Sequence, residues 1–288
     1  MKKWCVALFS LLLIAVMTSA CTMQRDTIEI DPNAVEHLPQ QSAPTPTKEA
    51  VGEQTAADTG EVPEKNDTQA ETPTPTPTEA PPEYVVVLDP GHGGKFTGAI
   101  YGGLVEKDVA LKLAIYTKEY LEEHYPNLIV HLTRETDKEF DAELAKDLEN
   151  RVQLGKELGA DVFVSLHLNA SVTHDVRGSE VICPHREHVK DEAAILANFI
   201  LDELAGLGLK RRGIVTRNSN DTVDEHGNPV EYYAINRHAA NRDMVGIIVE
   251  HCFMDNEAER AYLADDEALR RLAQADARGI ASYFGYGF

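Results

Sequence analysis

Residues 84–94 have the sequence YVVVLDPGHGG. The run Tyr84–Asp89 is short, rich in β-branched residues and followed by Pro90 and Gly91, a pattern typical of a strand buried on both faces of a sheet. A glycine-rich turn that contains His92 follows this run. The segment therefore predicts a buried strand that ends at a turn with an ionisable side chain.

Strand-like and helix-like segments alternate after this first run. The strands are predicted at residues 84–89, 128–133, 161–168, 179–183, 213–216 and 245–250. The helices are predicted at residues 106–124, 144–158, 187–207, 232–240 and 267–283. Because strands joined by helical crossovers pair in parallel, the order predicts an α/β three-layer sandwich with a central, mostly parallel sheet of about six strands.

The first 21 residues are typical of an export signal. Lys2 and Lys3 precede the apolar run Trp4–Val16, and small residues stand just before Cys21. This arrangement resembles a bacterial lipobox, in which Cys21 would be diacylated and anchor the chain to the membrane. A simple cleaved signal and an uncleaved single-helix anchor are the alternatives. All three place the rest of the chain outside the cell, at the outer face of the bacterial cytoplasmic membrane or in the cell wall.

Residues 22–83 are predicted to be a disordered tether. They contain 10 of the 14 prolines of the chain, no aromatic residue, and 13 acidic against 3 basic side chains. Such a composition cannot bury enough apolar surface to fold, and its prolines favour extended polyproline II structure. Residues 84–288 are left as one domain, predicted to be catalytic and monomeric.

The charge of the chain excludes one class of function. The 288 residues include 27 Lys and Arg against 48 Asp and Glu, a formal net charge of −21, and residues 84–288 alone hold 35 acidic against 22 basic side chains. Because affinity for nucleic acid depends on basic groups that replace counterions, we expect no nucleic-acid partner.

Four ionisable residues are predicted to lie at one edge of the sheet. His92 follows the first strand, Glu106 begins the first helix, and His167 and Glu250 end two later strands. Ligands of open α/β sheets bind at the carboxyl ends of the strands. Two imidazoles and a carboxylate suit zinc and leave a fourth position for water, while Glu250 is a spare carboxylate that can move protons.

Each of these residues also has a structural explanation. His92 could cap a turn, and Glu106 could complement the dipole of the helix that it begins. His167 and Glu250 follow buried runs, where an ionisable group requires a partner. No single residue of the four indicates a function. The prediction that all four lie at the same edge of the sheet favours a metallohydrolase.

The motifs around these residues resemble those of the zinc-dependent N-acetylmuramoyl-L-alanine amidases of the type 3 group, over about residues 84–284. They are found at residues 88–94 (LDPGHGG), 106–108 (EKD), 132–134 (LTR), 165–170 (SLHLNA), 178–180 (GSE) and 249–256 (VEHCFMDN). The resemblance implies that His92, Glu106 and His167 bind one Zn²⁺ and that Glu250 is catalytic. It also implies that peptidoglycan is the substrate, cut between the lactyl group of N-acetylmuramic acid and L-alanine.

The expected mechanism uses zinc-held water as the nucleophile and Glu250 as general base and acid. Asn169 and His251 are candidates for stabilising the oxyanion, although strand alternation points His251 away from Glu250. A different zinc peptidase or deacetylase acting on the wall and a non-catalytic wall-binding lipoprotein are the alternative functions.

Two further features of the sequence carry expectations. The polar segment 217–231 is predicted to be a loop, either a lip of the substrate site or an ordinary surface excursion. Cys183 and Cys252 are predicted to be buried free thiols, with a disulfide as the alternative.

Overall fold

The computed structural model describes residues 83–224 and 227–287. The predicted export signal, Cys21 and, apart from Glu83, the predicted tether lie outside the described residues. Within the described residues, no helix is both long and apolar enough to cross a membrane.

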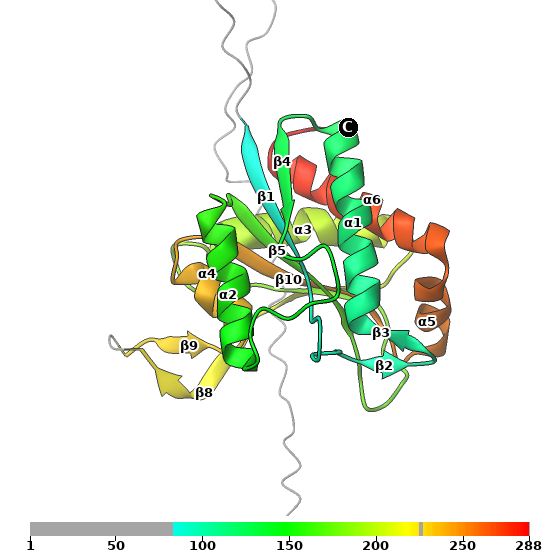
Figure 1. The fold of residues 1–288 in the computed structure, drawn as a ribbon, viewed down its shortest axis with the longest axis horizontal. Coiled ribbons are helices and arrows are strands. Elements are labelled where there is room, and N and C mark those ends of the chain that lie inside the picture. Colours follow the sequence, from blue (N-terminus) through cyan, green and yellow to red (C-terminus); the bar gives the residue numbers. More distant parts are fainter. Residues whose placement is uncertain (1–82, 225–226, 288) are drawn as a thin grey trace, which may run out of the picture.

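A single six-stranded sheet forms the centre of the domain (Figure 1). Its order is β4-β1-β5-β10-β6-β7, and the first four strands in this order are mutually parallel. β6 is antiparallel to β10 and parallel to β7. The strands are β1 (Tyr84–Pro90), β4 (Leu128–Leu132), β5 (Val162–Asn169), β6 (Ser179–Ile182), β7 (Arg211–Val215) and β10 (Val245–Phe253). The predicted mostly parallel α/β sheet is confirmed.

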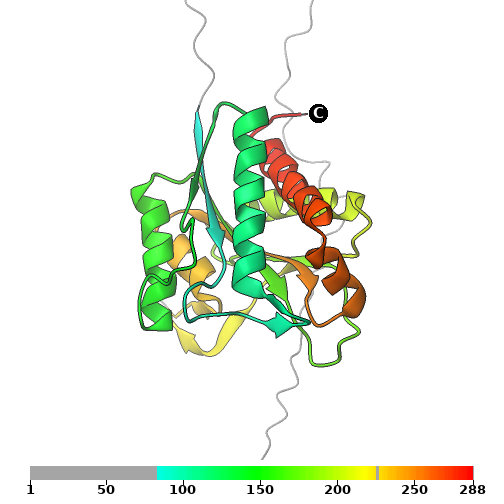
Figure 2. The ribbon, with the colours of Figure 1, turned by 45° about the vertical axis from the view of Figure 1, so that its right-hand side comes forward.

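Helices cover both faces of the sheet and complete three layers (Figures 1 and 2). One layer holds α1 (Glu106–His124), α3 (Lys190–Gly206) and α6 (Asp266–Tyr283), and α6 packs against both α1 and α3. The opposite layer holds α2 (Leu144–Glu157) and α4 (Ala234–Ala240). The short helix α5 (Glu257–Ala264) leads into α6.

The first part of strand β10, residues 245–249, shows why a run covered by helices on both faces carries no polar side chain. Ile247 and Val249 belong to the core under α1, α3 and α6, whereas Ile248 belongs to the core under α2 and α4. Successive side chains of a strand point to opposite faces, so a strand covered on both faces needs apolar residues at every position.

The structure corrects the prediction of a loop over residues 217–231. β8 (Asn218–Val223) and β9 (Pro229–Glu231) form an antiparallel hairpin there. Asp224 and Asn228 close the turn through a backbone hydrogen bond, and Gly227 takes the positive φ angle of 82° that such a turn requires. Polar side chains concealed the strands because the hairpin projects from the main sheet (Figure 1).

Three smaller differences are a short hairpin, a short helix and the length of one strand. β2 (Ile100–Tyr101) and β3 (Leu104–Val105) form a short hairpin that the sequence did not predict. α5 was also missed, although Asn256 caps it by accepting from the amides of Ala258 and Glu259. β10 continues three residues beyond Glu250.

Cys183 and Cys252 are free and buried. The prediction of two buried thiols is therefore confirmed.

Close packing of α6 on α3 gives a prediction about stability. A Cβ atom on Gly279 would lie 2.6 Å from the backbone Cα of Ile200, which cannot move away as a side chain end can. We expect Gly279→Ala to destabilise the domain by about 1–3 kcal/mol in thermal unfolding, because overpacking outweighs the usual gain of alanine in a helix. The control is Gly206→Ala at the end of α3, which has no neighbouring atom within 4 Å. Equal stability of the two variants would contradict the packing argument.

Candidate active site

The structure brings the four predicted site residues to the carboxyl edge of the parallel strands. His92 lies just beyond β1, Glu106 is the first residue of α1, and His167 and Glu250 lie near the ends of β5 and β10. His167 and Glu250 occupy paired positions on the two neighbouring strands. The predicted grouping of the four side chains is therefore observed.

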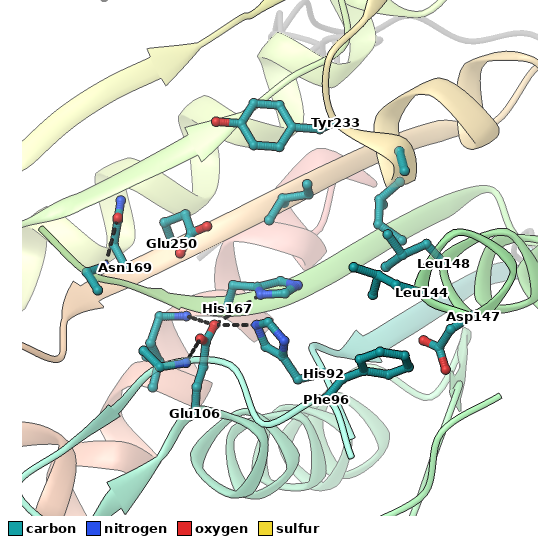
Figure 3. A pocket seen from close by; sticks show the side chains of 16 residues that line it. His92, Phe96, Glu106, Leu144, Asp147, Leu148, His167, Asn169, Tyr233 and Glu250 are labelled. Atoms are coloured by element: carbon teal, nitrogen blue, oxygen red, sulfur yellow. Dashed lines mark hydrogen bonds and ion pairs between the residues drawn. The ribbon is translucent and has the colours of Figure 1, made fainter. Parts of the chain in front are cut away.

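His92, Glu106 and His167 form a compact cluster that could hold a metal ion. One ligand atom from each lies within 4.8 Å of the others. Glu106 Oε1 is 3.1 Å from His92 Nε2 and 3.1 Å from His167 Nδ1. The two imidazole rings meet edge to face with centroids 4.8 Å apart (Figure 3). Ligands in tetrahedral positions about 2.1 Å from zinc are about 3.4 Å apart. The two distances from Glu106 to the histidines are close to this spacing, whereas the widest separation of 4.8 Å would have to shorten on binding.

The carboxylate of Glu106 is buried and fixed by backbone amides. Oε1 accepts from the amide of Leu168 at 3.1 Å, and Oε2 accepts from the amide of Ala99 at 2.8 Å. Burial opposes ionisation, but the hydrogen bonds with His167 and His92 outweigh it and lower the pKa of Glu106 well below its usual value. Glu106 is therefore a charged, oriented ligand at neutral pH.

His167 is prepared for metal binding in a different way. Burial lowers the pKa of His167, because the surroundings disfavour the charged imidazolium. A neutral imidazole keeps a lone pair that could bind a metal, and the lowered pKa favours this neutral form.

Two buried arginines hold the turn that contains His92. His92 itself has a φ angle of 59°, in the left-handed region. Arg134 donates to the carbonyls of Pro90 and Gly91, at 3.0 and 2.8 Å, and Arg151 donates to the carbonyls of Pro90 and His92. These bonds compensate for the strain of a non-glycine residue at positive φ and fix the direction of the imidazole.

Together with Asp147, Asp89 supplies the counter-charge for Arg151. Its Oδ1 is 3.0 Å from Arg151 Nη1, and both residues are about 1% exposed. Burial alone would raise the pKa of Asp89, but Arg151 and the hydroxyl groups of Thr133 and Ser165 lower it. Sequence reasoning included Thr133 and Arg134 only through the resemblance and missed Arg151, whose charged side chain lies on a helix remote in sequence.

Glu250 faces the cluster with one oxygen lacking a protein partner. Its Oε2 is buried and makes no hydrogen bond within the described part of the chain. Burial, together with the negative charges of Glu106 and Glu180, raises the pKa of Glu250 well above its usual value. Buried carboxyl groups with a raised pKa are typical of sites of general acid–base catalysis.

The four residues line a pocket of about 390 Å³. Glu250, Asn169 and Tyr233 lie on one side of His167, and Leu144 and Leu148 lie on the other (Figure 3). The pocket thus has a polar end beside Glu250, whereas its other end combines the apolar side chains of Leu144 and Leu148 with the carboxylate of Asp147 (Figure 3). Tyr233, which precedes α4, is a lining residue that sequence reasoning did not single out.

His251 lies on the opposite face of the sheet, as alternation predicted. It is fully buried, with Nε2 2.8 Å from Asp276 Oδ2 and Nδ1 3.0 Å from the carbonyl oxygen of His167. His251 therefore cannot contact an oxyanion in the pocket. Of the two residues predicted as candidates for stabilising the oxyanion, only Asn169 lines the pocket.

An α/β sandwich with a His-Glu-His cluster and a further buried carboxylate at the carboxyl edge of its sheet is typical of metal-dependent hydrolases. Residues 86–282 match the family model described as N-acetylmuramoyl-L-alanine amidase. The chain therefore belongs to the N-acetylmuramoyl-L-alanine amidase family and is a hydrolase, which confirms the resemblance seen in its motifs.

Individual relatives agree with this assignment. The germination-specific N-acetylmuramoyl-L-alanine amidase of Bacillus subtilis (strain 168) is 29% identical over 208 residues, which cover 69% of this chain and 79% of the relative. The endolysin of Bacillus phage SPP1 is 31% identical over 205 residues, covering 68% of this chain and 65% of the relative, just under two thirds. The catalytic domain of CwlV, an N-acetylmuramoyl-L-alanine amidase from Bacillus (Paenibacillus) polymyxa var. colistinus, is 30% identical with a TM-score of 0.57, covering 71% of this chain and 99% of that domain.

A pair of glycines tests the geometry of the cluster. A Cβ atom on Gly98 would lie 2.4 Å from Glu106 Oε2 and 2.7 Å from His92 Cδ2, whereas one on Gly103 would meet nothing within 4 Å. Both glycines have positive φ angles, so Gly98→Ala and Gly103→Ala introduce a similar backbone strain. Only the new methyl group of Gly98→Ala would enter the space occupied by Glu106 and His92. We expect Gly98→Ala to bind zinc about 10- to 100-fold more weakly than Gly103→Ala in a competitive chelator titration. Equal affinities would show that the cluster does not bind the ion.

Proposed function

We propose that this protein is a zinc-dependent peptidoglycan amidase that cleaves the bond between the lactyl group of N-acetylmuramic acid and L-alanine. One observation supports this most directly. Three ligand atoms of His92, Glu106 and His167 converge at one point, and the pocket that they line also contains the buried, unpartnered Oε2 of Glu250. Membership of the family supports peptidoglycan as the substrate, and the residues of the site support hydrolysis with the help of a metal ion.

The residues present fit a zinc ion. Two imidazoles and one carboxylate are a typical set of ligands for a catalytic zinc ion. A water molecule bound to such an ion could donate a hydrogen bond to the buried Oε2 of Glu250, which has no hydrogen-bond partner among the described residues. When bound, zinc would lower the pKa of water and polarise the carbonyl of the scissile amide.

Glu250 moves the proton in the proposed reaction. Its carboxylate accepts a proton from the attacking water as the water oxygen bonds to the lactyl carbonyl carbon. The carboxyl group then delivers this proton to the nitrogen of L-alanine while the carbon–nitrogen bond breaks. This transfer leaves the lactyl carboxylic acid, which then ionises in water, and a free alanine amine, so one carboxyl group serves both steps.

The proposed function is tested by digesting purified sacculi and analysing the products. The zinc-loaded chain should release new alanine amino termini, and a chelator should abolish the release until zinc is restored. We expect Glu250→Gln to keep stoichiometric zinc and to lose about 100- to 10,000-fold in rate, because it removes the proton acceptor without changing the shape.

The control is Glu123→Gln, which changes an exposed glutamate at the end of α1 and should keep full activity. New reducing ends or glucosamine amines in place of alanine termini would indicate one of the other wall hydrolases. Binding without any product would indicate a non-catalytic wall-binding protein.

We also propose that the enzyme acts outside the cell while attached to the membrane. Diacylation of Cys21 would anchor it at the outer face of the cytoplasmic membrane, and residues 22–83 would act as a spacer toward the wall. We propose no nucleic-acid partner, since residues 84–288 hold 35 acidic against 22 basic side chains. We also propose that the protein is a monomer.

The anchor has its own test. In a bacterial host that processes lipoproteins, we expect Cys21→Ser to move the chain from the membrane fraction to the soluble fraction. Mass spectrometry of the purified unsubstituted chain should find a diacylglyceryl group on an amino-terminal Cys21. A chain that begins at another residue and carries no lipid would contradict the proposal.

A further inference from the structure

Asn169 and Glu180 form a hydrogen-bonded bridge close to Glu250. Asn169 Nδ2 lies 2.7 Å from Glu180 Oε1. The two residues come from β5 and β6, which are the neighbours of β10 on its two sides. The bridge therefore crosses β10, the strand that carries Glu250.

The strand register explains why the bridge lies beside Glu250. Glu250 is paired with His167 on β5 and with Glu180 on β6, so the three side chains form a row on one face of the sheet. Beyond Glu250 the register of β10 shifts, and Asn169 is paired with Phe253. Such a bulge bends the strand and re-aims side chains next to a site.

Glu180 is held in place by a second partner. Its Oε2 is 2.7 Å from Arg212 Nε, and Glu180 is only 6% exposed. The guanidinium of Arg212 also lies 5.1 Å from the centre of the Phe253 ring. The ion pair offsets part of the cost of burying a carboxylate, so the acceptor for Asn169 has a fixed position.

These contacts fix the orientation of the Asn169 amide. An ionised carboxylate can only accept, so the group that faces Glu180 must be the NH₂ of Asn169. The Oδ1 atom accepts from the amide of Ala170 at 2.9 Å. One of the two N–H bonds of Asn169 is used by Glu180, and the second has no acceptor among the contacts of the described residues. Asn169 also lines the pocket.

We propose that Asn169 binds substrate by donating this second N–H to the carbonyl oxygen of the L-alanine residue, and that Glu180 is the positioning residue for Asn169. The proposal rests on the proposed function. Glu250 delivers its proton to the alanine nitrogen, so the alanine must lie on the side of Glu250. The carbonyl of this alanine is the first acceptor beyond that nitrogen. Asn169 lies on the same side of His167 as Glu250, away from Leu144 and Leu148 (Figure 3).

The test compares two ligands that differ in the carboxamide group that contains this carbonyl. N-acetylmuramoyl-L-alanine amide has it, and N-acetylmuramoyl isopropylamide lacks it. Their affinities are measured by calorimetry on the zinc-loaded full-length chain with Glu250→Gln, which prevents cleavage. We expect Asn169→Ala in this background to weaken the alanine amide about 3- to 10-fold and to leave the isopropylamide unchanged.

The controls separate a binding role from a structural one. Asn150→Ala removes an exposed asparagine of α2 that does not line the pocket, and it should change neither affinity. Glu180→Ala should reproduce the carbonyl-dependent loss with unchanged zinc content, and Glu180→Gln, which keeps an acceptor for Asn169, should recover part of it. If Glu180→Ala does not fold, the Asn169→Ala comparison still decides.

An equal loss for both ligands, or no loss for either, would overturn the assignment of Asn169. Loss of zinc in Asn169→Ala would also overturn it, because the residue would then support the metal cluster. If the chain with Glu250→Gln alone binds neither ligand, the proposed function fails and this inference fails with it. If the chain with Glu250→Gln binds both ligands and Asn169→Ala changes neither affinity, the inference about Asn169 is contradicted but the proposed function is not.

Discussion

The buried charge of Glu106 constrains the rest of the site. A carboxylate can stay ionised in a protein interior only if its oxygens are hydrogen-bonded. Here the amides of Ala99 and Leu168 and the imidazoles of His92 and His167 meet this need. These partners come from the loop after β1 and the end of β5, so the charge holds these two segments and the start of α1 at fixed distances. A metal site made of distant residues needs such a fixed frame.

The sequence predicted most of the sheet because burial on both faces leaves a direct signal. Residues 162–164 and 245–249 carry no polar side chain, and helices such as Glu106–His124 have helical periodicity. The grouping of the four acidic and imidazole side chains followed from the same signal, since parallel strands end at one edge. The β8–β9 hairpin was missed because a small, exposed hairpin has no apolar alternation.

The contacts that tune the site were less visible in the sequence. Arg151 is separated from Asp89 by 62 positions, and no local pattern links the two. Glu180 reaches Glu250 only because β6 runs antiparallel to β10, which places the beginning of β6 at the edge where β10 carries its carboxylate. Both relations depend on the three-dimensional order of strands, which periodicity does not determine.

The site therefore combines a compact His-Glu-His cluster that could hold a metal ion with a carboxyl group that has a raised pKa and, within the described residues, an oxygen without a hydrogen-bond partner. X-ray absorption at the zinc edge of the zinc-loaded chain tests this account most directly. The account predicts four nitrogen or oxygen ligands at about 2.0–2.1 Å with multiple scattering from two imidazoles. Sulfur ligands, a shell without imidazole scattering, or the failure of the chain to retain zinc would contradict it.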